Sequence, residues 1–260
     1  MEENNKAPLI SIITVVYNGE KYLEQTIQSV INQTYKNIEY IVIDGGSTDG
    51  TLDIIKKYEE HISYWVSESD KGLYDAMNKG IGVAKGELIG MINSDDWYEL
   101  EAVEIMAEAY KNNPTKSIFH ADRYDIDKDG NKTVRKFHPS AFKFKYYGMT
   151  YNHPSMFITN DEYKIHKYNT ELRALSDFQF VLETFLHNKT DLFYISKAIV
   201  NYRLDGISAQ MTLKKSLREG FNARKSAGMS FFSNSFSVIF RLGVFSIYKL
   251  KYFLINKTIS

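Results

Sequence analysis

The amino-acid sequence predicts an α/β fold in which a mostly parallel sheet is followed by a mixed second half and a helical C-terminal tail. Three observations predict it. The first apolar run, LISIITVVY at residues 9–17, is rich in β-branched residues and does not alternate with polar ones, as is typical of a parallel strand buried on both faces. Further strand-like runs then alternate with helical patterns, which indicates crossover helices between parallel strands. After residue 112 two strand-like runs flank a short turn, which indicates antiparallel pairing.

The first half shows a regular alternation of strands and helices. We expect a helix after the first strand, with Asn18 as its N-cap and apolar residues at helical spacing up to the turn QTYKN. The following strands and helices are expected at IEYIVI (38–43), LDIIKKYEE (52–60), ISYWV (62–66), GLYDAMNKGIGVA (72–84) and ELIGMI (87–92). Ligands of such sheets bind outside the carboxyl ends of the strands, which is where Asp44 and the adjacent Asp95 and Asp96 fall.

The second half has a different pattern. After a helix near residues 99–112, the runs SIFHADRYDI and TVRKF read as antiparallel strands joined through DKDGN. LSDFQFVLETFLHN, residues 175–188, predicts a helix opened by Ser176 and Gln179 in capping-box spacing, and KAIVNYRL predicts a further strand. We expect one domain over residues 1–210, with a first half at 8–110 and a second at 111–210, and an extension at 211–260.

Composition and charge exclude several classes of protein. The 260 residues include no cysteine, so disulfides and thiolate chemistry are excluded, and the N-terminal MEENNKAP has no apolar core like that of a signal peptide. We therefore expect a cytoplasmic protein. The formal net charge is +0, but residues 211–260 hold nine Lys or Arg and one acidic residue, Glu219, so an acidic body carries a basic tail. This distribution argues against a nucleic-acid binder and favours a tail that meets an anionic surface.

Three familiar binding motifs can be excluded. DIDKDGN, residues 125–131, copies the first half of an EF-hand loop, but Lys136 stands where the bidentate glutamate is needed and strands flank the loop, so a hairpin turn is the better interpretation. GIGVAKG, residues 80–86, ends a helix, whereas a dinucleotide fingerprint opens one. The chain has no GxxxxGK[ST] segment, so a P-loop kinase or ATPase is not expected.

The acidic groups at the strand ends carry the strongest functional signal. Asp95 and Asp96 are adjacent like charges, whose repulsion a hard divalent cation can offset, and Mg²⁺ or Mn²⁺ typically uses one or two carboxylates together with substrate phosphates. A solvated turn or helix cap is the alternative interpretation. Asp44, at another strand end of the same sheet, favours a site.

At this point the sequence resembles a known family. SIITVVYNGEKYLEQTIQSVINQTYKNIEYIVIDGGSTDGT, followed by SESDKGLYDAMNKGIGVAKGELIGMINSDDW, looks like the nucleotide-binding half of a family 2 glycosyltransferase with the GT-A fold. The resemblance is dense over residues 8–110 and continues to about residue 208 through NHPSMF, LSDFQF and YRLDGIS. In combination these motifs are highly specific.

The resemblance implies roles for individual residues. Val16, Tyr17 and Asp44 would hold the base and ribose of a nucleotide-sugar donor, and Ser94 and Asp95 would also contact the donor. Asp95 and Asp96 would form the acidic motif that binds Mn²⁺ or Mg²⁺. Asn93 stands where the fuller motif has an aspartate. Lys71, Asp75 and Asn78 would line the donor pocket. His153 would line the donor or the acceptor site.

The resemblance also implies the chemistry. Asp177 would be the general base of an inverting displacement, although an acidic residue in the first turn of a helix is also favoured by the helix dipole. The expected acceptor is lipid-linked or a polysaccharide. A sugar nucleotidyltransferase remains an alternative, but VVYNGEKY lacks the glycine-rich, basic loop that such an enzyme needs. A degenerate scaffold or glycan-binding protein is a third hypothesis.

The tail suggests where the enzyme works. Residues 236–255 contain fourteen apolar positions in twenty, but Arg241, Lys249 and Lys251 interrupt them, so lying in a membrane interface is favoured over spanning. We expect the basic side chains to reach anionic headgroups, which would place the protein peripherally on the inner face of the cytoplasmic membrane. Packing of the tail on the catalytic domain, or on a second copy in a homo-oligomer, is the alternative.

Overall fold

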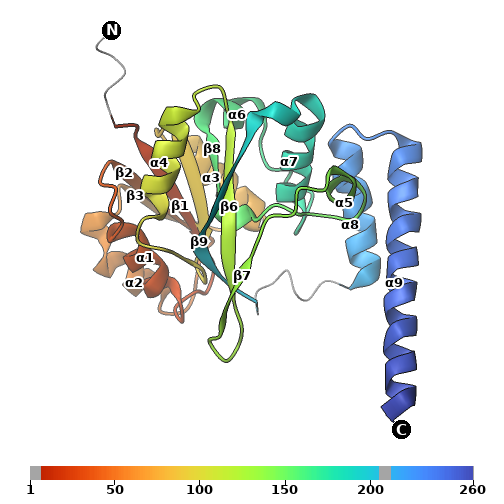
Figure 1. The fold of residues 1–260 in the computed structure, drawn as a ribbon. Coiled ribbons are helices and arrows are strands. Elements are labelled where there is room, and N and C mark those ends of the chain that lie inside the picture. Colours follow the sequence, from red (N-terminus) through yellow and green to blue (C-terminus); the bar gives the residue numbers. More distant parts are fainter. Residues whose placement is uncertain (1–6, 205–211, 260) are drawn as a thin grey trace.

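The computed structural model describes residues 7–204 and 212–259, and these confirm the α/β fold (Figure 1). The first half contains β1 Ile10–Val16, α1 Leu23–Ile31, β2 Ile38–Asp44, α2 Thr51–Lys57, β3 Tyr64–Ser67, α3 Leu73–Val83, β4 Leu88–Asn93, β5 Trp97–Tyr98 and α4 Ala102–Asn112. The remainder contains β6 Ile118–Ile126, β7 Lys132–Arg135, α5 Ala141–Tyr146, β8 Met156–Thr159, α6 Asn160–Ile165, α7 Ser176–His187, β9 Leu192–Arg203, α8 Leu213–Ser226 and α9 Phe231–Ile259. Residues 205–208 of YRLDGIS and the expected boundary at residue 210 lie outside the described residues.

The described strands form a nine-stranded sheet in the order β3-β2-β1-β4-β8-β6-β9-β5, with β7 paired to β6. β1 is parallel to both β2 and β4, and β2 is parallel to β3. The sheet changes direction at β8, which is antiparallel to β4 and to β6, whereas β6 and β9 are parallel to each other. The expected change from a parallel to a mixed sheet is therefore confirmed.

Both faces of the central strand β1 are covered, which explains why its sequence does not alternate. Ile13 and Val15 belong to a cluster with residues of α3 and α7. Ile12 and Val16 belong to a second cluster with residues of α1 and α4. The sheet therefore separates two apolar layers.

Two glycines allow neighbouring elements to approach closely. A Cβ on Gly80 of α3 would lie 2.5 Å from Cγ2 of Ile13 in β1. A Cβ on Gly90 of β4 would lie 2.6 Å from Cε1 of Phe157, whose ring crosses the strand from β8. In the GIGVAKG segment Gly80 therefore serves helix-to-strand packing, in agreement with its place at the end of a helix.

Two predicted helix caps are wrong. α1 begins at Leu23, and Asn18 instead has φ 50° and accepts a hydrogen bond from the Thr48 N–H through Oδ1 (2.9 Å). α7 begins at Ser176 itself, whose hydroxyl accepts from the Asn169 N–H (2.5 Å). The backbone N–H groups of residues 174 and 175, just before α7, donate instead to Glu219 Oε1 of α8.

The hairpin expected at DKDGN is confirmed. β6 and β7 are antiparallel, and Asp127 Oδ1 accepts from the N–H groups of Asp129 and Asn131 (2.9 and 2.8 Å). Gly130 has φ 83°, a conformation that side chains disfavour. The Asp127 carboxylate thus binds the backbone of its own loop in a turn.

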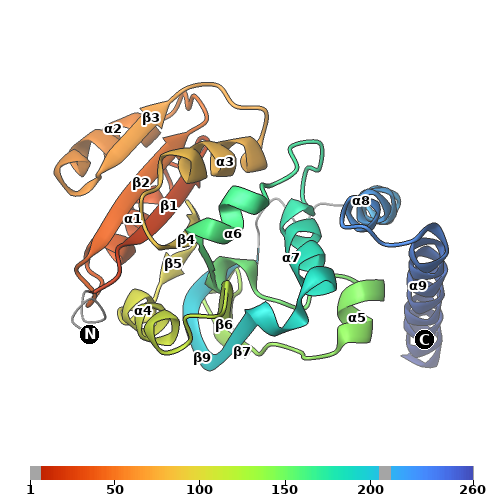
Figure 2. The ribbon, with the colours of Figure 1, turned by 90° about the horizontal axis from the view of Figure 1, so that it is seen from above.

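The C-terminal helices lie at the side of the molecule away from α1 and α2 (Figure 2). α8 packs on α7, and α9 packs on α8 and α5 through ring contacts such as Tyr146 with Phe236 (5.2 Å between centroids). Among the described residues Phe231–Lys249 is long and apolar enough to span a bilayer, with a mean hydropathy of 1.2 and 11% of the segment buried. Length and composition alone do not show that it does. Large apolar side chains that remain exposed on α9 include Phe232, Ile239 and Tyr248.

Candidate active site

The register of the parallel strands brings the predicted donor residues to one edge of the sheet. Val16 lies beside Asp44 in the β1–β2 pairing, and Val15 lies beside Asn93 in the β1–β4 pairing. The Gly45 N–H donates to the Val16 carbonyl (2.8 Å), which ties the two strand ends together. Tyr17 follows directly and is 65% exposed, so its ring is available at this edge.

Asp44 is fully buried and its carboxylate is bound within the chain. Oδ2 accepts from the N–H groups of Gly46 and Ser47 (3.1 and 3.0 Å) and from the Ser67 hydroxyl (2.6 Å), and Oδ1 accepts from the Ser47 hydroxyl. Asp44 therefore shapes the loop after β2. The carboxylate of Asp70 fills the space above Gly45, close to Tyr17.

The acidic pair follows β4, and its two members have different surroundings. Asp96 is 1% exposed, and its Oδ1 accepts from the Arg203 N–H (3.0 Å). Burial, and then the charge of Asp95, raises the pKa of Asp96 well above its usual range, against smaller opposing contributions from Arg203 and Arg123. Asp95 is partly exposed, and its carbonyl accepts from Arg203 Nε (2.8 Å). Arg203 thus braces the loop that carries the pair.

The oxygen atoms at this strand end fit a hard divalent cation. Asn93 Oδ1 is buried without a hydrogen-bond partner, while Asn93 Nδ2 donates to Asp96 Oδ2 (3.5 Å). Mg²⁺ and Mn²⁺ favour oxygen ligands and need only one or two carboxylates when substrate phosphates complete the coordination. Within residues 7–204 and 212–259 no group of three or more His, Asp or Glu side chains is placed so that it could hold a metal ion.

A cavity of about 680 Å³ lies between the two halves of the sheet domain. It is lined by residues 71–75 before and within α3, by Asn93 at the end of β4, and by Asp177 at the start of α7. Lys71, Asp75 and His153 among the predicted residues also line it. Val16, Tyr17, Asp44, Ser94, Asp95 and Asp96 belong to the adjoining strand edge instead, and none of them lines the cavity.

Asp177 is held by a network of aromatic residues. The buried Tyr74 of α3 donates its hydroxyl to Asp177 Oδ1 (3.0 Å), and its ring lies 5.5 Å from that of Tyr168. The Tyr168 hydroxyl is 2.9 Å from His153 Nε2. Burial lowers the pKa of His153, and the charge of Asp177 opposes that shift. The side chains of His153 and Asp177 thus line the same cavity.

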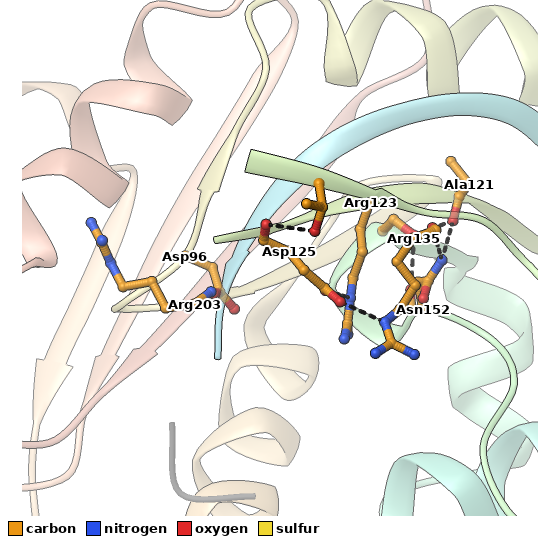
Figure 3. A network of polar contacts seen from close by, with 9 residues as sticks. Asp96, Ala121, Arg123, Asp125, Arg135, Asn152 and Arg203 are labelled. Carbon is orange, nitrogen blue, oxygen red and sulfur yellow. Dashed lines mark hydrogen bonds and ion pairs between the residues drawn. The ribbon is translucent and has the colours of Figure 1, made fainter. Parts of the chain in front are cut away.

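Arg123 is a site residue that the sequence did not reveal. Its Nε bonds to Asp125 Oδ1 (2.7 Å), while Arg135 Nε bonds to Asp125 Oδ2 (2.7 Å), as Figure 3 shows. The Arg123 guanidinium lies 3.9 Å from the centroid of the Tyr202 ring, and both residues line the cavity. Two arginines share one carboxylate, so the group of Arg123, Asp125 and Arg135 carries a net positive charge.

The remaining predicted residues have visible structural roles. Asn78 does not line the cavity: its Nδ2 donates to the Tyr168 carbonyl (2.8 Å) and its Oδ1 accepts from the Tyr168 N–H (3.1 Å). Asp75 Oδ2 accepts from the Lys71 N–H (3.0 Å). The Ser94 carbonyl accepts from the Thr26 hydroxyl (2.9 Å). Direct donor contacts of these side chains stay predictions.

Comparison with known proteins decides the family. The sequence model of glycosyl transferase family 2 matches residues 11–165. The chain belongs to this family. An uncharacterized glycosyltransferase of Methanocaldococcus jannaschii is 29% identical over 209 residues, 76% of this chain and 71% of that protein. The chondroitin synthase of Escherichia coli is 33% identical over 128 residues, 48% of this chain and 19% of the synthase. The Pasteurella multocida hyaluronan synthase is 32% identical over 129 residues, 49% of this chain and 13% of that protein.

Solved structures confirm the GT-A fold of this family 2 glycosyltransferase. TarS 1-349 from S. aureus in complex with UDP superposes with a TM-score of 0.68 at 18% identity, over 90% of this chain and 70% of that one. The mannosyltransferase PcManGT from Pyrobaculum calidifontis, in complex with GDP-Man and Mn²⁺, gives 0.60 at 15% identity, over 92% and 70%. The relatives thus include polysaccharide synthases, and structural neighbours bind nucleotide-sugar donors.

Proposed function

We propose that the protein is a metal-dependent inverting glycosyltransferase that moves one sugar from a nucleoside diphosphate sugar, of which a UDP-sugar is the first candidate, to a lipid-linked or polysaccharide acceptor. The observation that carries the proposal is the cavity. It joins Asn93, beside the donor edge, to Asp177, and it is lined by Arg123. The intact carboxylates argue against a degenerate scaffold, and membership of the family argues against a nucleotidyltransferase.

The roles follow from the positions of the side chains. The base and ribose lie on the strand edge of Val16, Tyr17 and Asp44. The acceptor hydroxyl enters the cavity, where its oxygen attacks the anomeric carbon while Asp177 takes the hydroxyl proton. The bond between the anomeric carbon and the phosphate oxygen breaks, and the nucleoside diphosphate leaves on the opposite face. Configuration at the sugar is therefore inverted.

The leaving diphosphate needs positive charge. Arg123 supplies one fixed charge at the cavity wall, because Asp125 is shared with Arg135. Mn²⁺ or Mg²⁺, held by Asp95 and Asp96 with the unpartnered Asn93 Oδ1, would stabilise the charge that develops on the diphosphate. The Tyr74 hydroxyl orients the Asp177 carboxylate toward the acceptor.

The test is a panel of nucleotide sugars assayed for nucleoside diphosphate release, with Mn²⁺ and with EDTA. Asp177→Asn should lower acceptor-dependent transfer by about 100-fold or more, the scale of general base catalysis, while donor affinity is kept. Glu171→Gln is the matched control, because Glu171 lines the same cavity but is exposed. Release from no donor, or equal transfer by Asp177→Asn, would overturn the proposal.

We further propose that the exposed side of α9 attaches the enzyme to the inner face of the cytoplasmic membrane. Phe232 and Ile239 are 84% and 69% exposed, and Lys249 and Lys251 are exposed further along the same helix. The double substitution Phe232→Ser with Ile239→Ser should reduce sedimentation with phosphatidylglycerol vesicles. Ile165→Ser, at a residue 73% exposed on α6, is the control. Equal sedimentation of all three proteins would exclude this attachment.

A further inference from the structure

A second cavity, of about 290 Å³, lies between the catalytic body and the two C-terminal helices. Met149 lines both this cavity and the catalytic one. Leu175, just before α7, and Phe178, in its first turn, lie on either side of Asp177 in the chain and also line this cavity. The second cavity therefore adjoins the active site.

Two arginines line this cavity from different helices. Arg224 of α8 is 1% exposed; its Nε donates to the Lys145 carbonyl (2.7 Å), its Nη1 to the Gly220 carbonyl (2.9 Å), and its Nη2 has no partner. Arg241 of α9 donates from Nη2 to the Ser216 hydroxyl (2.7 Å). Its side chain thus faces α8, and does not extend from the helix toward headgroups as the sequence suggested.

The two guanidinium groups are close to one another and lack an acidic partner. A Cβ on Gly220 would lie 2.8 Å from Arg241 Nη1 and 2.9 Å from Arg224 Nη1. The two guanidinium nitrogens therefore lie on either side of the same small space next to Gly220. In the part of the chain that the structure describes, neither arginine forms an ion pair. Glu219, the acidic residue of the tail, instead accepts from the backbone before α7.

The Phe178 ring, whose centroid lies 5.0 Å from the Arg224 guanidinium, attracts this cation, but it carries no full negative charge to offset the repulsion between the two arginines as an anion would. Burial, and then the charge of Arg241, lowers the pKa of Arg224 to about 10, so the side chain is still charged at neutral pH. Buried charges without partners are strongly destabilising, and arginine donors match the oxygens of phosphate groups. A bound phosphate would use the free Nη2 of Arg224 and offset the repulsion.

The rest of the cavity indicates what carries the phosphate. Leu213 of α8 and Val244, Phe245 and Tyr248 of α9 form an apolar wall. Phe245 and Tyr248 are 46% and 65% exposed, so this wall continues onto the open surface of α9. A ligand with an anionic group and an apolar chain fits both parts.

We propose that this cavity binds the phosphate of a lipid-linked acceptor, with Arg224 and Arg241 on the phosphate oxygens and the lipid chain along α9. Because the cavity adjoins the first turn of α7, the sugar attached to that phosphate would extend toward Asp177. The inference rests on the proposed function and selects the lipid-linked class of acceptor over a free polysaccharide.

Calorimetric titration with farnesyl phosphate tests the site on the intact 260-residue chain. Farnesol, which lacks the phosphate, and inorganic phosphate, which lacks the chain, should bind at least 10-fold more weakly. Arg224→Gln and Arg241→Gln should each weaken farnesyl phosphate binding by about 10-fold or more, the loss expected for hydrogen bonds to a charged group. Lys225→Gln, at an exposed neighbour on α8, should bind normally.

The outcomes separate this site from the catalytic one, because donor-dependent release of nucleoside diphosphate is measured in the same variants. Normal release with no binding of farnesyl phosphate would overturn the lipid-phosphate site and leave the proposed function standing. Binding that neither arginine substitution weakens would also overturn it. Arg241→Gln keeps the test decisive if Arg224→Gln does not fold. Arginine-dependent binding of phosphatidylglycerol vesicles, without binding of farnesyl phosphate, would assign the cavity to a membrane headgroup instead.

Discussion

Replacing Gly80 and Gly82 of α3 by alanine should change the stability of the protein in opposite directions. Both glycines lie in the same helix, where alanine is favoured by up to about 1 kcal/mol. A Cβ on Gly82 meets nothing within 4 Å, so Gly82→Ala should stabilise. A Cβ on Gly80 would lie 2.5 Å from Ile13 Cγ2, closer than any normal carbon contact, so α3 must move away from β1.

The magnitude follows from this difference. Adding a methyl group to a fully packed core costs about 1 to 3 kcal/mol. Because both variants gain the same helix propensity, the free energies of unfolding of Gly80→Ala and Gly82→Ala should differ by this packing cost. At about 2 to 4 °C per kcal/mol, the melting temperature of Gly80→Ala should fall at least about 2 °C below that of Gly82→Ala. Differential scanning calorimetry measures both. Equal melting temperatures would refute the close approach of α3 to β1.

Three further predictions concern the site and its surroundings. Asp95→Ala should remove Mn²⁺-dependent donor binding in a calorimetric titration while thermal stability stays within about 0.5 kcal/mol, as for most surface changes; unchanged binding would exclude this carboxylate from the metal site. Tyr74→Phe keeps the ring but removes the donor to Asp177, so kcat should fall by about 10- to 100-fold at unchanged donor affinity, and a normal kcat would contradict that role. Burial lowers the pKa of His120 from 6.5 to about 3, so between these values the unfolded chain binds a proton that the folded protein does not, and stability falls as the pH falls. In His120→Phe the free energy of unfolding, measured in urea, should fall less steeply from pH 6.5 to pH 4, by up to about 1.4 kcal/mol per pH unit, and an equal slope would contradict this.

Much of the fold is predictable because strand burial leaves a direct trace in sequence. A strand such as β1, covered on both faces, must be apolar throughout, and the strand-end position of Asp44 and Asp95 follows from the βα alternation. The caps were not predictable in this way. Ser176 has the spacing of a capping box, but its hydroxyl binds Asn169 instead, and Asn18 adopts a positive φ before the helix begins. In both cases tertiary hydrogen bonds outweigh the local signal.

The role of Arg123 in the wall of the catalytic cavity could not be predicted from the sequence for a related reason. Arg123 lies in the middle of β6, and only the pairing of β6 with β9, which places Tyr202 within reach, shows that it faces the site. The two-residue strand β5 and the six-residue helices α5 and α6 are too short for a periodic pattern. The sequence therefore did not predict these short elements, which are held in place by residues distant in the chain. The position of Asp177 at the start of α7 was correctly predicted.

The close contact between Gly90 and the Phe157 ring limits how the two halves of such an enzyme can be exchanged between homologues. Within the sheet, β4 of the parallel half and β8 of the second half form three residue pairs, and Phe157 lies over a strand position that has no side chain. A recombination event, or an engineered chimera, that exchanges one half for that of a homologue would place a new side chain against this ring unless both partners are inherited together. Positions 90 and 157 should therefore covary among homologues, and a domain-swapping experiment should transplant them as a unit.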